Sequence, residues 1–151
     1  LAFVRKLYGS TYKLVFRPHP FGINEMRLLD LEQYEIESDG LISELYLYHN
    51  IGHIHAVFAV ESTSSRSALN FFINAYSFLN IFPYDKEMND YFRRNYGNVP
   101  DEFYVDDLSI IPYDYVKIEG VEEAAAKCRE VLDELANSKP YWREAVERTS
   151  P

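Results

Sequence analysis

The run SALNFFINAYSFLNIF at residues 67–82 is the longest stretch of the chain without a charged residue, and it constrains the fold most. If the run is helical, its polar side chains recur at intervals of four, four and three residues, beginning just before it: Arg66, Asn70, Asn74 and Ser77. The polar stripe is then narrow, and a helix that is apolar around most of its circumference is buried between layers or lies at an interface. The pattern therefore predicts a largely buried helix over residues 64–82.

Two runs before this segment have the composition of β-strands. LISELYLYHN (41–50) and HIHAVFAVE (53–61) are rich in β-branched and aromatic residues, and little more than Ile51-Gly52 separates them. They predict a β-hairpin. TYKLVF (11–16) is predicted as a further strand. MRLLDLEQYEIES (26–38) could be a strand or a short helix, and the alternation through Tyr34 and Ile36 favours the strand.

Helices dominate the second half of the predicted fold. YDKEMNDYFRRN (84–95) is amphipathic and ends before Gly97, and VEEAAAKCREVLDELAN (121–137) places its apolar residues on one face. Between them, residues 108–118 suggest a strand interrupted at Pro112. Strands followed by helices indicate a single α+β domain over residues 1–151. We expect a mainly antiparallel sheet of about four to five strands, packed against the helix 64–82 and the C-terminal helix 121–137.

Negative charge is concentrated in the second half of the chain. The whole sequence carries a formal charge of −9, and residues 81–137 hold fourteen acidic against six basic residues. A field of that sign repels a phosphate backbone, so general nucleic-acid binding is disfavoured. A basic corner formed by the first residues stays open as a minor alternative. Its cations are Arg5, Lys6, Lys13 and Arg17.

Cys128 is the only cysteine, so the chain cannot form an intrachain disulfide, which is compatible with a reducing compartment. The uncharged run is too short and too rich in asparagine to span a bilayer. The first ten residues lack the apolar core of a signal peptide. We therefore expect a soluble, cytoplasmic protein without membrane contact.

Three of the four histidines lie in HNIGHIH, around the predicted turn. A three-residue loop Asn50-Ile51-Gly52 would place all three imidazoles on one face, whereas a loop of Ile51-Gly52 alone would turn the first away. Glycine at the third loop position favours the three-residue form. Such a cluster could bind a divalent transition metal or transfer protons, although exposed histidines at a sheet end are the simpler interpretation. The residues are His49, His53 and His55.

STSSRS lies where the predicted sheet gives way to the predicted buried helix. Backbone amides at a helix start, together with Ser64, Ser65 and Arg66, could bind a phosphate or carboxylate. The glycines and lysine of a phosphate-binding loop are absent, and serines at a helix start commonly act as caps. Capping is therefore the favoured interpretation.

Acidic and aromatic residues alternate between residues 84 and 115, and the whole chain contains 13 Tyr and 10 Phe. Aromatic side chains among carboxylates suit a surface that binds a basic protein, because rings supply contact area and charge steers the encounter. The other interpretation makes the rings core residues and the acids solvated. The residues proposed for this surface are Tyr84, Asp101, Tyr104, Asp106, Asp107 and Tyr113.

These patterns support two main functional hypotheses. The first is a non-enzymatic binding or regulatory module that engages a basic protein partner, or a second copy of itself, through the acidic, tyrosine-rich surface. The alternative is a small metal-binding or acid/base enzyme centred on the histidine cluster. No nucleophile, carboxylate partner or cofactor motif accompanies those histidines, so the first hypothesis is preferred.

Overall fold

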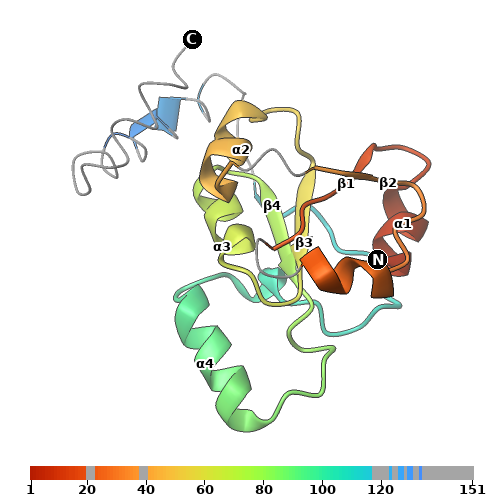
Figure 1. Cartoon of the computed structure of the whole chain (residues 1–151). Coiled ribbons are helices and arrows are strands. Elements are labelled where there is room, and N and C mark those ends of the chain that lie inside the picture. Colours follow the sequence, from red (N-terminus) through yellow and green to blue (C-terminus); the bar gives the residue numbers. More distant parts are fainter. Residues whose placement is uncertain are drawn as a thin grey trace. The chain divides into compact units, whose positions relative to one another are not determined.

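A computed structural model describes residues 1–19, 23–37 and 41–116, together with six residues of the predicted C-terminal helix (Figure 1). The chain divides into two compact units, which are described separately. Unit 1 comprises Leu1–Leu41 with Leu108–Ile111, and unit 2 comprises Ile42–Asp107 with the chain from Pro112 onward. The organisation of the chain as a single domain stays a prediction.

Unit 1 contains a helix, a 3₁₀ helix and a pair of short strands. Its elements in chain order are α1 (Ala2–Tyr8), β1 (Leu14–Phe16), the 3₁₀ helix η1 (Ile23–Leu28) and β2 (Tyr34–Ile36). The strands are parallel, with Leu14 opposite Tyr34 and Phe16 opposite Ile36. Among the described residues of this unit, only Leu14 is a buried hydrophobic residue. The strand predicted over 11–16 is confirmed at Leu14–Phe16. Of the strand predicted over 26–38, only Tyr34–Ile36 forms, and the range begins inside η1 instead.

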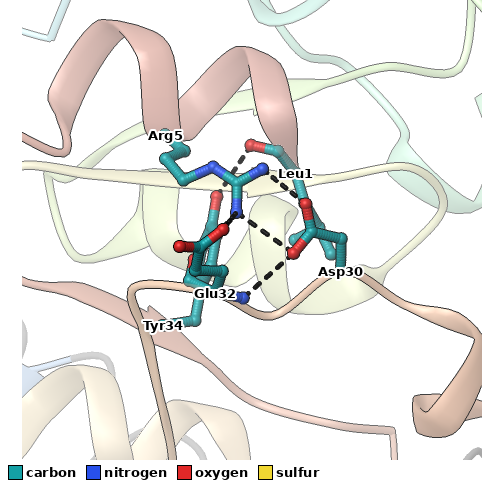
Figure 2. Close-up of polar contacts among 5 residues, drawn as sticks. All are labelled: Leu1, Arg5, Asp30, Glu32 and Tyr34. Carbon is teal, nitrogen blue, oxygen red and sulfur yellow. Dashed lines mark hydrogen bonds and ion pairs between the residues drawn. The ribbon is translucent and has the colours of Figure 1, made fainter.

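Polar contacts tie α1 to the segment that leads into β2, as Figure 2 shows. The Arg5 guanidinium donates to both carboxylate oxygens of Asp30, at 2.5 and 3.2 Å, and to the carbonyl of Glu32 at 3.0 Å. The Tyr34 hydroxyl donates to the Leu1 carbonyl at 2.9 Å. The hydrogen bond from Arg5, with one from the Glu32 amide, lowers the pKa of Asp30 to about 2. Charge-assisted hydrogen bonds thus hold a unit that has little buried apolar surface.

Unit 2 is built around a parallel strand–helix–strand motif. Strand β3 (Ala56–Ala59), helix α3 (Thr63–Asn70) and strand β4 (Asn74–Ser77) follow one another, and the two strands pair in parallel with Ala56 opposite Asn74. Helix α2 (Ser43–His49) precedes this motif. Helix α4 (Lys86–Tyr96) and the 3₁₀ helix η2 (Asp101–Phe103) follow it. A parallel bridge between Ser77 and Tyr104 extends the sheet on the far side of β4.

The core of unit 2 lies between α2, α3, β4 and the segment around η2. Phe71, Phe103 and Leu79 are fully or almost fully buried in it. Tyr96, at the end of α4, packs its ring 5.0 Å from that of Phe103. Contacts between aromatic rings therefore complete the core around β4, and all four residues of this strand are buried.

The uncharged run at 67–82 is mostly buried, but it is not one helix. Helix α3 ends at Asn70, Phe72 takes a positive φ of 56°, and the chain then enters β4. A strand of a parallel pair that is covered on both faces has a nearly continuous apolar sequence, which resembles a buried helix. The predicted helix 64–82 is therefore wrong beyond Asn70.

The predicted hairpin is also wrong, because its first strand is helix α2. Glu44 lies in the first turn of this helix, and its carboxylate accepts a hydrogen bond from Ser67 of α3 at 2.7 Å. The Ser43 and Ser64 hydroxyls are 2.7 Å apart, and Leu45 and Leu47 are buried. Packing against α3 thus overrides the β propensity of LYLY.

The predicted mainly antiparallel sheet is contradicted by the strand pairing. In the described ranges the strands form two parallel pairs, β1–β2 and β3–β4. No strand forms over residues 108–116 either. The prediction assumed that neighbouring strands were joined by tight turns, but helix α3 connects β3 to β4 as a crossover.

Two predicted helices agree with the structure where it describes them. Helix α4 begins after Asp85, whose carboxylate accepts from the Met88 amide at 2.8 Å, and ends before Gly97 at a φ of 65°. Of the predicted helix 121–137, the described residues are all helical: Glu123, Ala126, Lys127, Arg129, Glu130 and Asp133. The rest of that prediction lies outside the described residues. Over the part that is described, no helix is long and apolar enough to cross a membrane.

Candidate functional site

Segment 98–116 carries five carboxylates and no Lys or Arg. A buried stretch in its middle fixes it to unit 2, because Phe103 is fully buried and the Val105 amide donates to the Ser77 carbonyl at 2.9 Å. The acids on either side of this stretch are exposed: Asp101 and Glu102 before it, and Asp106 and Asp107 after it.

The end of the segment returns to the same strand. Amides of Tyr115 and Val116 donate to the Asn74 side-chain carbonyl at 3.0 and 2.9 Å, and the Tyr115 hydroxyl donates to the Ala75 carbonyl. Burial raises the pKa of Tyr115 to about 12. The Tyr76 hydroxyl donates to the Tyr113 carbonyl at 2.9 Å. The middle and the C-terminal end of the acidic segment are thus tied to β4.

A hydrogen-bonded chain links Asp106 to helix α4. The Asn80 amide donates to the Asp106 carboxylate at 2.5 Å, and the Asn80 carbonyl accepts from the Arg93 guanidinium at 2.6 Å. Arg93 also donates to Asn89 at 2.8 Å and stacks 4.3 Å from the centre of the Tyr104 ring. Asp106 and Tyr104 are therefore held in defined positions beside one cation of α4.

Tyr113 lies beside the acid that precedes Phe103. Its hydroxyl donates to the Glu102 carboxylate at 3.1 Å, and the ring remains 64% exposed. That hydrogen bond raises the pKa of Tyr113, because deprotonation would leave two negative groups in contact. Glu102 was not among the predicted site residues. The sequence could have indicated it, because Glu102 directly follows Asp101 within DEFYVDD.

Tyr84 belongs to a different cluster. Its ring lies 6.1 Å from Phe82 and 5.5 Å from Phe92, and its hydroxyl hydrogen-bonds to Glu61. Burial and the neighbouring carboxylate raise the pKa of Tyr84 to about 12. The structure therefore links Tyr84 to the aromatic packing beside α4 instead of to the acids of segment 98–116.

The three predicted metal-site histidines come from a helix end, a turn and the approach to a strand. His49 is the last residue of α2, His53 lies in the following turn, and His55 directly precedes β3. His55 Nε2 is 3.6 Å from the Asp114 carboxylate. Within the described ranges, no group of three or more His, Cys, Asp or Glu residues is placed to hold a metal ion. Metal binding by these histidines stays a prediction, but the hairpin that was expected to bring them together does not form.

STSSRS acts as a capping segment. Ser62 is the N-cap of α3, and its hydroxyl accepts from the Ser64 amide at 3.2 Å. Ser65 is fully buried and donates to the Ser62 carbonyl at 2.7 Å, while Arg66 donates to the Tyr96 carbonyl at the end of α4 at 3.0 Å. Anion binding by Ser64, Ser65 and Arg66 stays a prediction. These contacts give each residue a structural role.

The N-terminal basic corner is largely occupied by internal contacts. Arg5 binds Asp30, and Lys13 pairs with Glu35 at 2.6 Å. Arg17 donates to the Leu41 carbonyl at 2.9 Å. Nucleic-acid binding through these residues stays a prediction, and no contact among the described residues of unit 1 favours it.

Comparison with protein families, with curated proteins and with solved structures finds no significant match. The function is therefore inferred from the arrangement of the residues themselves. Cys128 lies outside the described residues.

Proposed function

We propose that this chain is a non-enzymatic binding module that engages a basic segment of a protein partner. The contact is made by an acidic surface on segment 98–116, which we define by its carboxylates and two tyrosines. These are Asp101, Glu102, Asp106, Asp107 and Asp114, with Tyr104 and Tyr113. The observation that carries the proposal is a cation-free acidic segment tied to β4 in its middle and at its C-terminal end.

Fixed positions matter because binding is weakened by the entropy lost when mobile groups become ordered. The backbone here is already held by Val105 and by Tyr115, and hydrogen bonds from Asn80 and Tyr113 orient two of the carboxylates. Exposed charges of one sign also accelerate the encounter with an oppositely charged partner. The surface is therefore arranged for recognition before a partner arrives.

Arginine fits this surface better than lysine. A guanidinium can pair with a carboxylate through two hydrogen bonds and can stack on an aromatic ring at the same time. The chain contains an internal example of the stacking, because Arg93 lies over the Tyr104 ring and donates to Asn80, whose amide in turn holds Asp106. Tyr113, which is exposed and lies beside Glu102, offers a similar combination to an external arginine.

We also propose a cytoplasmic location for this module. The single cysteine supports it, because proteins of oxidising compartments commonly rely on disulfides and these 151 residues cannot form one internally.

The proposal is tested with a short synthetic peptide that alternates Arg and Leu, followed by calorimetry or fluorescence anisotropy. The triple variant Asp101→Asn/Glu102→Gln/Asp106→Asn should weaken binding at least about tenfold, because several charge pairs are lost together. The peptide with Lys in place of Arg should bind less tightly. Raising the salt concentration should weaken binding of the native protein more than that of the triple variant.

A matched control removes the same number of charges elsewhere. The variant Glu123→Gln/Glu130→Gln/Asp133→Asn alters exposed helical residues outside the acidic surface and should bind the peptide as the native protein does. Equal losses in both triple variants would reveal an effect of net charge alone and would refute a defined binding surface.

A further inference from the structure

Loop 106–114, with the sequence DDLSIIPYD, exposes large apolar side chains between carboxylates. Leu108 is 46% exposed, Ile110 63% and Ile111 67%. A strand was predicted here, but these three residues lie in a turn, a bend and an irregular stretch, respectively. They therefore pair with no strand of the described chain, and their side chains stay in contact with solvent. We call them the apolar loop residues.

The chain on both sides of this loop is fixed to β4. Before the loop, the Val105 amide donates to the Ser77 carbonyl at 2.9 Å. After it, the Tyr115 amide donates to the buried Asn74 side chain at 3.0 Å. A loop with fixed ends has less conformational freedom to lose on binding than a free segment has. Neighbouring exposed apolar side chains with a polar border are typical of an interaction site.

The charges that border the apolar loop residues decide what can cover them. Asp106 and Asp107 precede these residues and Asp114 follows them, all three acids are exposed, and the loop contains no cation. A second copy of this chain would bring the same carboxylates against one another, and an anionic lipid surface would be repelled in the same way. Cations on a partner protein would be attracted. Charge therefore favours a partner whose apolar side chains lie among arginines or lysines.

We propose that the apolar loop residues form the centre of the contact with the partner, and that the partner segment is amphipathic, with apolar side chains bordered by cations. This inference rests on the proposed function, because the carboxylates on either side supply the electrostatic attraction. Protein interfaces commonly combine an apolar centre, from which water is excluded, with a polar rim. The apolar loop residues should thus govern affinity, and the carboxylates should govern its dependence on salt.

Two peptides separate the apolar contact from the charge. One alternates Arg and Leu, and the other has Ser in place of each Leu, so that both carry the same charge. The native protein should bind the Arg-Leu peptide at least about tenfold more tightly, because only leucine offers apolar surface to the loop. Fluorescence anisotropy of the labelled peptides measures both dissociation constants.

The variant Ile110→Ala/Ile111→Ala should remove most of this preference. It should raise the dissociation constant of the Arg-Leu peptide at least about tenfold and leave that of the Arg-Ser peptide within about twofold of the native value. Both side chains are exposed, so urea unfolding should be unaltered. The matched control Met88→Ala/Tyr91→Ala shortens two exposed side chains of α4 and should bind both peptides as the native protein does.

Isoleucine methyl resonances report the contact without any substitution. In a nuclear magnetic resonance titration of the native protein, the methyl signals of Ile110 and Ile111 should shift more with the Arg-Leu peptide than with the Arg-Ser peptide. Equal shifts with the two peptides would show that leucine does not reach the loop, and this result would overturn the inference.

The two proposals fail in different ways. Equal affinity of the native protein for both peptides, with both weakened by Asp101→Asn/Glu102→Gln/Asp106→Asn, would overturn this inference and leave the proposed function standing. Self-association of the native protein that Ile110→Ala/Ile111→Ala abolishes would also overturn it, because a second copy would then cover the loop. A preference for Arg-Leu that the isoleucine variant loses and the acidic triple variant keeps at native affinity would refute the proposed role of the carboxylates and support the apolar contact.

Discussion

Both units contain a pair of parallel strands, yet only one pair forms the centre of a core. In unit 2, α3 connects β3 to β4 and all four residues of β4 are buried. In unit 1, Val15 of β1 and Ile36 of β2 remain 36% and 49% exposed. The link between these strands contains a 3₁₀ helix instead of an α-helical crossover. A parallel pair is therefore stabilised by the layer that covers it, and unit 1 relies on ion pairs where unit 2 relies on packing.

The largest expected effect comes from removing a core ring in unit 2. Phe103→Ala should lower the free energy of unfolding by about 3–5 kcal/mol, because Phe103 is fully buried and its loss leaves a cavity. Urea unfolding measures this change. Leu28→Ala in unit 1 alters an exposed side chain and should shift stability by no more than about 0.5 kcal/mol. Similar costs at the two positions would remove the contrast between the units.

A smaller effect on stability is expected from removing the Tyr96 hydroxyl, which forms hydrogen bonds inside unit 2. The Tyr96 hydroxyl accepts from the Ser62 amide at 3.0 Å and donates to the Val60 carbonyl at 3.2 Å. Tyr96→Phe should cost about 1–3 kcal/mol, since buried groups would be left without partners. Tyr91→Phe makes the same chemical change at an exposed ring and should leave unfolding unaltered. A neutral Tyr96→Phe would show that the hydroxyl contributes nothing to the unit.

The smallest stability effect concerns the Arg5–Asp30 pair of unit 1, and it should depend on pH. Asp30 has a folded-state pKa of about 2, below the ordinary 3.8. The contribution of the pair is therefore complete above the ordinary value and is lost as the pH falls toward 2. Amide hydrogen exchange of β1 and β2, corrected for intrinsic rates, should show protection that declines across this window.

Asp30→Asn sharpens that measurement, because it removes the titrating group without changing the shape of the side chain. Protection of β1 and β2 in the variant should be lower at neutral pH and should lose this part of its acid dependence. Identical pH profiles in the native and variant proteins would show that the pair does not hold the unit together.

Local patterns predicted the elements whose signals lie within one stretch of sequence. Asp85 caps the start of α4, Gly97 with its positive φ follows the end of the helix, and most of the uncharged run is buried as expected. Helix α2 could not be predicted in this way, because contacts with Ser64 and Ser67 of α3 stabilise a segment with β propensity. The predicted sheet failed for a related reason: β4 lies within a continuous apolar run whose pattern does not distinguish a buried strand from a buried helix, so the parallel pairing of β3 with β4 was missed.

The residues of the candidate site also divide into those that a local sequence pattern predicted and those that it could not predict. The acidic and aromatic composition of DEFYVDD is visible in the sequence, and it identified most of the acidic surface. The residues that orient this surface are distant in sequence: Asn80 reaches Asp106, and Arg93 reaches Tyr104. Tyr84 looked equivalent to the other tyrosines by composition, although its contacts belong to the α4 aromatic cluster. Composition indicates which residues could form a surface, and only the fold shows which of them meet.

The most direct test of the proposed function is a nuclear magnetic resonance titration of the isotope-labelled protein with the Arg-Leu peptide. Amide shifts should change progressively for residues 101–107 and 113–116, and those of β1 and β2 should stay constant. Progressive changes in the acidic surface that disappear in the triple variant would establish it as the binding site. Changes confined to other residues, or none at saturating peptide, would contradict the proposal that this chain recognises basic partners through segment 98–116.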